Sequence, residues 1–195
     1  MATIGLLVET YVDPRRLVAV LVFGLSMVAL YTASSVYHLW PWQGRHHTRL
    51  RALDHASIFL LIAGTYTPIC VIVLGGRLGG MVLALIWGLA LVGISCALLP
   101  LRLPPWAVGA QSLGMGWLAL IPLPRLLHAL PLQAMAVFAT GGILYTIGAV
   151  IFALRRPNPW PRFFGFHEIF HLFVIGGSAA FLIGIWIWVV PFTQS

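Results

Sequence analysis

Six long apolar stretches dominate this chain and restrict what it can fold into. They cover residues 17–40, 53–74, 78–99, 103–123, 130–154 and 166–190. Each exceeds about 20 residues with few charges, which is enough for a helix to cross a hydrocarbon core about 30 Å thick. They are apolar nearly all round, whereas the strands of a membrane barrel alternate apolar and polar positions. We therefore predict an all-α integral membrane protein with a single transmembrane domain over residues 1–195.

The composition agrees with this class and excludes others. Only 8% of the 195 residues are charged and 61% are hydrophobic, whereas about a quarter of the residues of a soluble domain are charged. The net charge of +7 comes from 11 arginines spread along the chain, and a nucleic-acid-binding surface would cluster them. We expect no nucleic-acid partner. Cys70 and Cys96 lie within predicted spans, and we expect small core residues there, not a disulfide.

Residues 1–12 form a shorter apolar segment. A helix of 12 residues reaches about 18 Å and cannot span a membrane alone. The segment has no basic start and no small-residue cleavage site, so we expect no signal peptide but a partial helix or the end of a longer one.

The arginines also predict an orientation. The loops after the first, third and fifth spans lie on the same side of the membrane and hold seven arginines, against four on the other side. The positive-inside rule places the richer side in the cytoplasm. The seven are Arg45, Arg49, Arg51, Arg102, Arg155, Arg156 and Arg162.

Ionisable residues within spans are informative, because each costs roughly 2.5 to 3.5 kcal/mol at the centre of a helix in a membrane. Six occur here, all near the ends of spans. Because successive spans cross the membrane in opposite directions, these six residues lie at the same face of the membrane, independently of the orientation predicted from the arginines. They are His38, Asp54, His55, His167, Glu168 and His171.

Four of these residues and one neighbour predict a metal site. His167 and His171 are four apart and share one side of a helix, and His38 offers a third imidazole. Three histidines with one open position are typical of catalytic zinc. Asp54 could bind the metal or accept a hydrogen bond from its water, and Ser34 lies one turn before His38.

Two alternatives stay open. Asp54, Glu168 and His38 could each favour a helix end electrostatically, an effect of about 0.3 to 1 kcal/mol; singly this is the simpler explanation, and their joint convergence favours a metal. HEIFH (167–171) also fits the H-E-x-x-H motif of zinc proteases, but the further carboxylate expected downstream is missing, since Glu168 is the last acid. We expect the remaining histidines to lie outside the site: His46, His47, His55 and His128.

Three sequence blocks, SSVYH (34–38), LDH (53–55) running on into IFLLIAGTYTP (58–68), and FHEIFHLF (166–173), resemble the hemolysin III family. That family is related to the progestin and adiponectin receptors and, more distantly, to the alkaline ceramidases. The resemblance extends from about Arg15 to near the end of the chain. It implies a seven-helix-type bundle in the bacterial plasma membrane, here with a shortened first helix.

The resemblance also implies a Zn²⁺ site near the cytoplasmic face. His38, His167 and His171 would be the ligands, Asp54 would hold the zinc-bound water, and Ser34 would stand beside them. The chemistry expected is hydrolysis of an amide or ester bond of a membrane lipid, and the ceramidase relationship suggests an amide. Alternatives are a pore-forming or membrane-perturbing cytolysin and a receptor-like sensor with structural zinc.

Overall fold

The computed structural model describes residues 13–39, 42–99, 105–160 and 164–193, and these residues are almost entirely helical. The predicted partial helix over residues 1–12, together with Arg102 and Arg162, lies outside the described residues. The helices are α2 (Pro14–Leu39), α3 (Gly44–Pro68), α4 (Gly76–Leu98), α5 (Pro105–Trp117), α6 (Leu123–Ala129), α7 (Leu132–Leu154) and α8 (Phe166–Gly184), with a 3₁₀ turn η2 (Leu118–Leu120) and π-helical segments η1 (Ile69–Leu74) and η3 (Ile185–Val189).

The described helices confirm the all-α membrane fold. Five of them, with their π-helical extensions, are long and apolar enough to cross a membrane, and α5 with α6 makes a sixth if that bent pair is one span. The predicted boundaries agree with four of the structural spans within about three residues. The predicted second and fourth spans differ from the helices of the structure.

The fourth predicted span, residues 103–123, is not one straight helix. The chain bends by 52° between Ala107–Leu120 and Leu123–Ala129. Pro122 and Pro124 lie at this break and have no backbone N–H to continue the helical hydrogen bonds, although the first turn of a new helix tolerates proline. The bend therefore follows from the two prolines, which the apolar pattern alone did not take into account.

The second predicted span begins earlier than expected. Residues 44–52, predicted as a loop, are helical and extend α3 to a 31-residue helix, Gly44–Leu74, when η1 is included. Such a helix is about 46 Å long and exceeds a hydrocarbon core of about 30 Å. Arginine is a good helix former, so the polar residues continue the helix out of the apolar layer.

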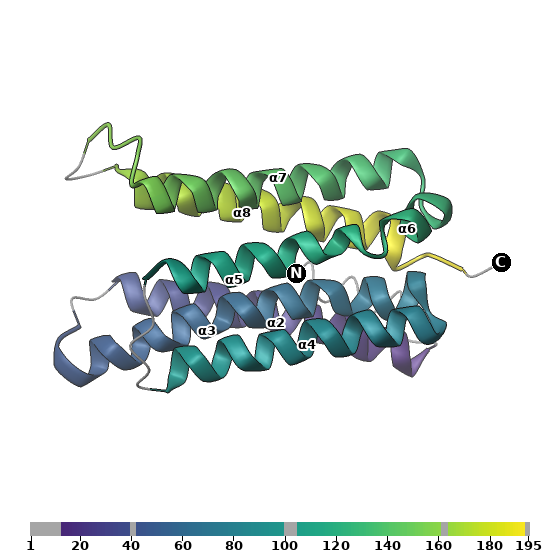
Figure 1. Cartoon of the computed structure of the whole chain (residues 1–195), viewed down its shortest axis with the longest axis horizontal. Helices are drawn as coiled ribbons and strands as arrows, with labels where there is room; N and C mark the ends of the chain where they lie inside the picture. Colours follow the sequence, from purple (N-terminus) through teal and green to yellow (C-terminus); the bar gives the residue numbers. More distant parts are fainter. Residues whose placement is uncertain (1–12, 40–41, 100–104, 161–163, 194–195) are drawn as a thin grey trace.

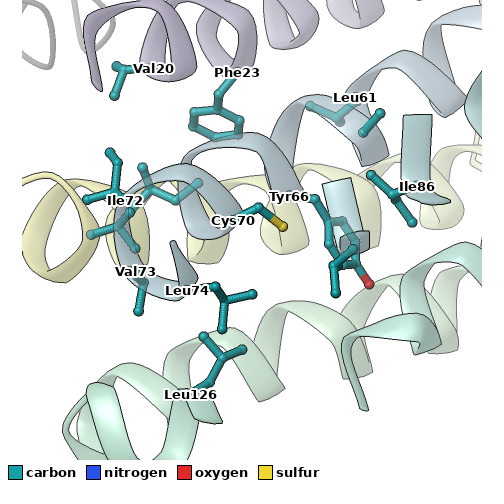
Figure 2. Packing of buried hydrophobic residues seen from close by; sticks show 14 of the residues in the cluster. Val20, Phe23, Leu61, Tyr66, Cys70, Ile72, Val73, Leu74, Ile86 and Leu126 are labelled. Atoms are coloured by element: carbon teal, nitrogen blue, oxygen red, sulfur yellow. The ribbon is translucent and has the colours of Figure 1, made fainter. Parts of the chain in front are cut away.

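Helix α3 is the centre of the packed core. In the most apolar stretch of α3 and its extension η1, 67% of the residues are buried, and α2 and α4 pack along α3. Its Tyr66 hydroxyl lies 2.9 Å from the carbonyl oxygens of both Met115 and Gly116. Figure 2 shows Phe23 of α2, Cys70 of η1 and Leu126 of α6 in the same apolar cluster. Both cysteines are free, as predicted.

Two groups of helices lie side by side. Helices α7 and α8 pack closely on one another, α2, α3 and α4 form the other group, and α5 runs between them (Figure 1). Within the described residues, α2 and α8 are not among the pairs that pack along their lengths. Helices α2, α4 and α7 end, and α3, α5 and α8 begin, at the left end of Figure 1. This shared end contains the candidate site.

Candidate metal centre

The last turn of α2 and the first two turns of α8 bring three histidines together. His38 is the penultimate residue of α2, and His167 and His171 lie one turn apart near the start of α8. The two helices run in opposite directions, so these ends meet at one depth, as chain alternation predicts. His38 is exposed, and His167 and His171 are half-buried. The site is thus open at the surface of the bundle end.

The three imidazoles point at one another. His167 Nε2 lies 3.3 Å from His38 Nε2 and 3.0 Å from His171 Nε2. One ligand atom from each ring falls within 4.8 Å of the other two. Within the described part of the chain, no other group of three or more histidine, cysteine or acidic side chains meets this condition.

These distances fit a zinc ion. Two nitrogens bonded to one tetrahedral zinc, each about 2.0 to 2.1 Å from it, lie roughly 3.3 Å apart. The Nε2 atoms of the two closer pairs are 3.3 and 3.0 Å apart, so the rings need little movement to share one ion. Neutral imidazoles are common zinc ligands, and three of them leave the fourth position open.

Aromatic side chains surround the histidine rings. Phe152 of α7 packs at 5.9 Å, between ring centroids, from His167, and Tyr37 lies 4.6 Å from His38. Phe170 lies 5.3 Å from His171. Sequence reasoning did not identify these neighbours, because nothing in the spacing along α7 shows that Phe152 faces α8.

Asp54 lies near the histidines but not at a helix start. It is half-buried in the third turn of α3, whose first turn contains no acidic residue, so the helix-end explanation for Asp54 is wrong. Its charge interacts with His167. Among the described residues, no hydrogen bond or ion pair joins the Asp54 carboxylate to the three rings; its backbone carbonyl accepts one from Ser57 at 2.6 Å.

Ser34 is half-buried one turn below His38 on α2. Within the described ranges its hydroxyl makes no hydrogen bond to a site histidine. The structure therefore brings together the three predicted ligands, places Asp54 within electrostatic range, and leaves the role predicted for Ser34 without a contact.

Glu168 caps the start of α8. Its Oε2 accepts a hydrogen bond of 2.8 Å from the backbone N–H of Gly165, the residue before the helix. A carboxylate at this third helical position satisfies an N–H that has no partner within the helix. Glu168 is thereby engaged in capping, which agrees with the helix-end explanation and further weakens the protease interpretation.

The other four histidines do not belong to the ligand group. His46 and His47 are exposed, as expected, but belong to α3 and not to a loop; His47 Nε2 is 3.2 Å from the Tyr37 hydroxyl. His55 is half-buried in α3, and His128 is exposed in α6. None of these four belongs to the group of histidines that could hold a metal among the described residues.

The chain is similar to known membrane proteins of one family. The family model described as "Haemolysin-III related" matches residues 1–182. The chain is 38% identical over 178 residues to Hemolysin-3 of Bacillus cereus, covering 89% of this chain and 76% of that protein. It is 35% identical over 164 residues to a Hemolysin-3 homolog of Bacillus subtilis (strain 168), covering 84% and 74%. A more distant relative is the human Monocyte to macrophage differentiation factor, 26% identical over 172 residues, covering 85% and 68%.

Proposed function

The chain belongs to the haemolysin III-related family of membrane proteins, and from this premise we propose that it is a zinc-dependent hydrolase of membrane lipids. The observation that carries the proposal is the convergence of three imidazoles from two helices on one point. Helix-end electrostatics would favour each residue at its own helix terminus. It gives no reason for His38 and His167 to face one another across helices that do not pack along their lengths.

Each residue of the site has a separate role in the proposed reaction. His38, His167 and His171 would hold Zn²⁺, which when bound supplies Lewis acidity and lowers the pKa of water from 15.7 to about 7. Asp54, a half-buried carboxylate near His167, would accept a proton from the attacking water and return it to the leaving group. Ser34, one turn deeper than His38, would approach the substrate carbonyl from the bundle side.

The surroundings of the site favour a lipid substrate. The histidines lie at the end of apolar helices, beside exposed apolar side chains such as Leu172 and Leu39. An acyl chain can lie along these helices with its amide or ester bond at the level of the histidines. The amide is the preferred substrate, by analogy with the ceramidases. Because more arginines lie on the side of the histidines, we also propose that the site faces the cytoplasm.

Elemental analysis of the purified full chain tests the metal. We expect zinc in the wild-type protein and its loss in His167→Ala and His171→Ala, because two imidazoles hold the ion far less tightly than three. His128→Ala is the matched control, since its ring is exposed in α6 at the other end of the bundle. Zinc content unchanged in the two α8 variants would refute the site.

A lipid screen with Asp54→Asn tests the chemistry. The zinc-loaded wild type should release fatty acid from ceramide-like amides or from ester lipids, and Asp54→Asn should lose turnover while keeping its metal. Removing a general base costs about 10²- to 10⁴-fold in rate. Metal bound to both proteins with no hydrolysis of either lipid class would exclude the hydrolase and leave a structural zinc, as in a receptor-like sensor.

A membrane-perturbing function is the second candidate, because the names of the two Bacillus relatives state a haemolysin. Release of a dye trapped in vesicles distinguishes it. A cytolysin should release dye equally with Asp54→Asn and with the wild type, whereas dye release that follows lipid hydrolysis should be lost in this variant.

A further inference from the structure

A cavity lies at the end of the bundle opposite the histidines. Helix α2 begins at this end, at the right of Figure 1, and the last described residues of the chain lie there as well. The volume of the cavity is about 420 Å³, within the range of sites that hold small molecules. The described residues that line it come from the start of α2, from η1 and from the segment after η3. They are Asp13, Arg15, Arg16, Val71, Ile72 and Thr193.

The lining of the cavity is apolar on its inner side and charged on its outer side. Ile72 is buried, with 2% of its surface exposed, and Val71 is half-buried. Asp13 and Arg16 are half-buried, and Arg15 is exposed. A molecule that fills the cavity therefore contacts hydrocarbon on one side and charge on the other. This combination suits an amphipathic ligand.

The apolar part of the lining belongs to an irregular helical segment. Directly after Pro68, the chain leaves α-helical geometry and forms the π-helical segment η1. Segment η1 contacts both α2 and the second π-helical segment, η3. Such segments are rare in proteins and frequently occur at functional sites. Two of them in contact beside one cavity favour a binding role for this end of the bundle.

The charged part of the lining has an excess of positive charge. Asp13 uses both carboxylate oxygens locally: Oδ1 accepts a hydrogen bond of 2.9 Å from the backbone N–H of Arg15, and Oδ2 lies 3.4 Å from Nε of Arg16. In the part of the chain that the structure describes, the Arg15 guanidinium has no ion pair. One carboxylate thus opposes two guanidinium groups, and the cavity favours an anion.

The position of the cavity relative to the membrane indicates which anion is at hand. Helix α2 is a candidate membrane span that begins at Pro14, so Arg15 and Arg16 lie at the level of the lipid headgroups. Phosphate is the anionic group found at this level. The planar guanidinium group matches two phosphate oxygens at once and is weakly hydrated, which makes arginine well suited to binding phosphate.

We propose that this cavity is a phosphate-binding site, in which Arg15 and Arg16 contact the phosphate. The apolar inner side favours the phosphate of an anionic phospholipid, whose glycerol carbons would contact Val71 and Ile72. This inference goes beyond the proposed hydrolase. The rise of helix α2 separates Arg16 from His38 by about 33 Å, so a headgroup held here is far from the histidines and is not the substrate in the metal site.

Native mass spectrometry of the purified full chain, titrated with phosphatidylglycerol in detergent, tests the site. Arg15→Gln and Arg16→Gln should each bind this lipid about tenfold more weakly, the effect of losing a hydrogen bond to a charged group. Arg77→Gln is the matched control, because Arg77 is exposed near the start of α4 and does not line the cavity. Its affinity should stay within about twofold of the wild type. An equal loss in all three variants would show general surface attraction and overturn the proposal.

A variant that should gain affinity guards against misfolding as the cause of a loss. Asparagine caps a helix as well as aspartate does, so Asp13→Asn should keep the start of α2 intact. It removes the charge that competes for Arg16 and should tighten phosphatidylglycerol binding about twofold to fivefold. Unchanged or weaker binding in this variant would contradict the proposed contact between Arg16 and the phosphate.

Competition with inorganic phosphate distinguishes the two sources of the ligand. Phosphatidylglycerol that stays bound supports a lipid site, whereas its displacement supports a site for free phosphate, and either result requires the arginines. Zinc content should be the wild-type value in Arg15→Gln and Arg16→Gln, because both lie far from the histidines. Arginine-dependent lipid binding by a protein without zinc would refute the hydrolase alone. Zinc binding without arginine-dependent lipid binding would refute this site alone.

Discussion

The α2–α3–α4 group and the α7–α8 pair differ in how they are stabilised. In the most apolar stretch of the span formed by α3 and η1, 67% of the residues are buried within the protein, whereas in α7 the share is 11%. Helix α3 is enclosed by neighbours, but α7 presents most of its surface outward. The candidate metal centre takes His38 from the first region and His167 and His171 from the second. Stability and site assembly therefore depend on different contacts, and substitutions can separate them.

The same aromatic truncation in each region should give the largest difference. Phe59 of α3 is 1% exposed, and Phe59→Ala should lower the free energy of unfolding by about 3 to 5 kcal/mol through the cavity it leaves. Phe181 of α8 is half-buried and packs on Phe138, so Phe181→Ala should cost clearly less. Reversible unfolding in mixed micelles measures both. Equal costs would remove the distinction between the regions.

Added volume in the enclosed region should have a smaller effect. A Cβ at Gly93 of α4 would lie 2.7 Å from the Phe59 ring, whereas at Gly88 of the same helix it would meet nothing within 4 Å. Gly93→Ala should therefore destabilise the protein by about 1 to 3 kcal/mol through overpacking. Gly88→Ala should leave stability unchanged or slightly raised, since alanine favours helix. If both variants unfold alike, α4 does not pack on Phe59 as described.

Removing the cap at the start of α8 should have the smallest effect on stability. It also tests whether Glu168 has a role beyond capping. Glu168→Ala deletes the acceptor of the Gly165 N–H and should cost about 1 kcal/mol of stability. Zinc content should stay that of the wild type, because Glu168 is not a ligand in the proposed site. Loss of lipid hydrolysis at unchanged stability would instead show that Glu168 takes part in the chemistry.

Particular residues show how far sequence reasoning reached. His167 and His171 are four apart in one helix, so their shared face follows from helical geometry, and alternation of the spans brings His38 to the same membrane face. Asp54 was expected in a first turn and lies in the third, because α3 continues through its arginine-rich segment. The break between α5 and α6 was missed because its cause, Pro122 and Pro124, lies outside the apolar pattern.

The hydrogen bond of 2.8 Å between the hydroxyls of Tyr145 in α7 and Ser178 in α8 marks a limit of sequence reasoning. Tyr145 and Ser178 are ordinary residues in apolar helices, and no spacing along the chain connects them. Their relationship exists only between helices, and it depends on the side of each helix that faces its neighbour.

The sequence by itself determined the membrane class, most of the spans and the common depth of the histidines, because hydropathy and helical periodicity act along one chain segment at a time. Only the tertiary structure decided that the three imidazoles face one another, that Glu168 caps α8, and that Ser178 bonds across to Tyr145. These contacts depend on the rotation and relative depth of separate helices. Packing between helices sets both, and the order of residues within each helix leaves them open.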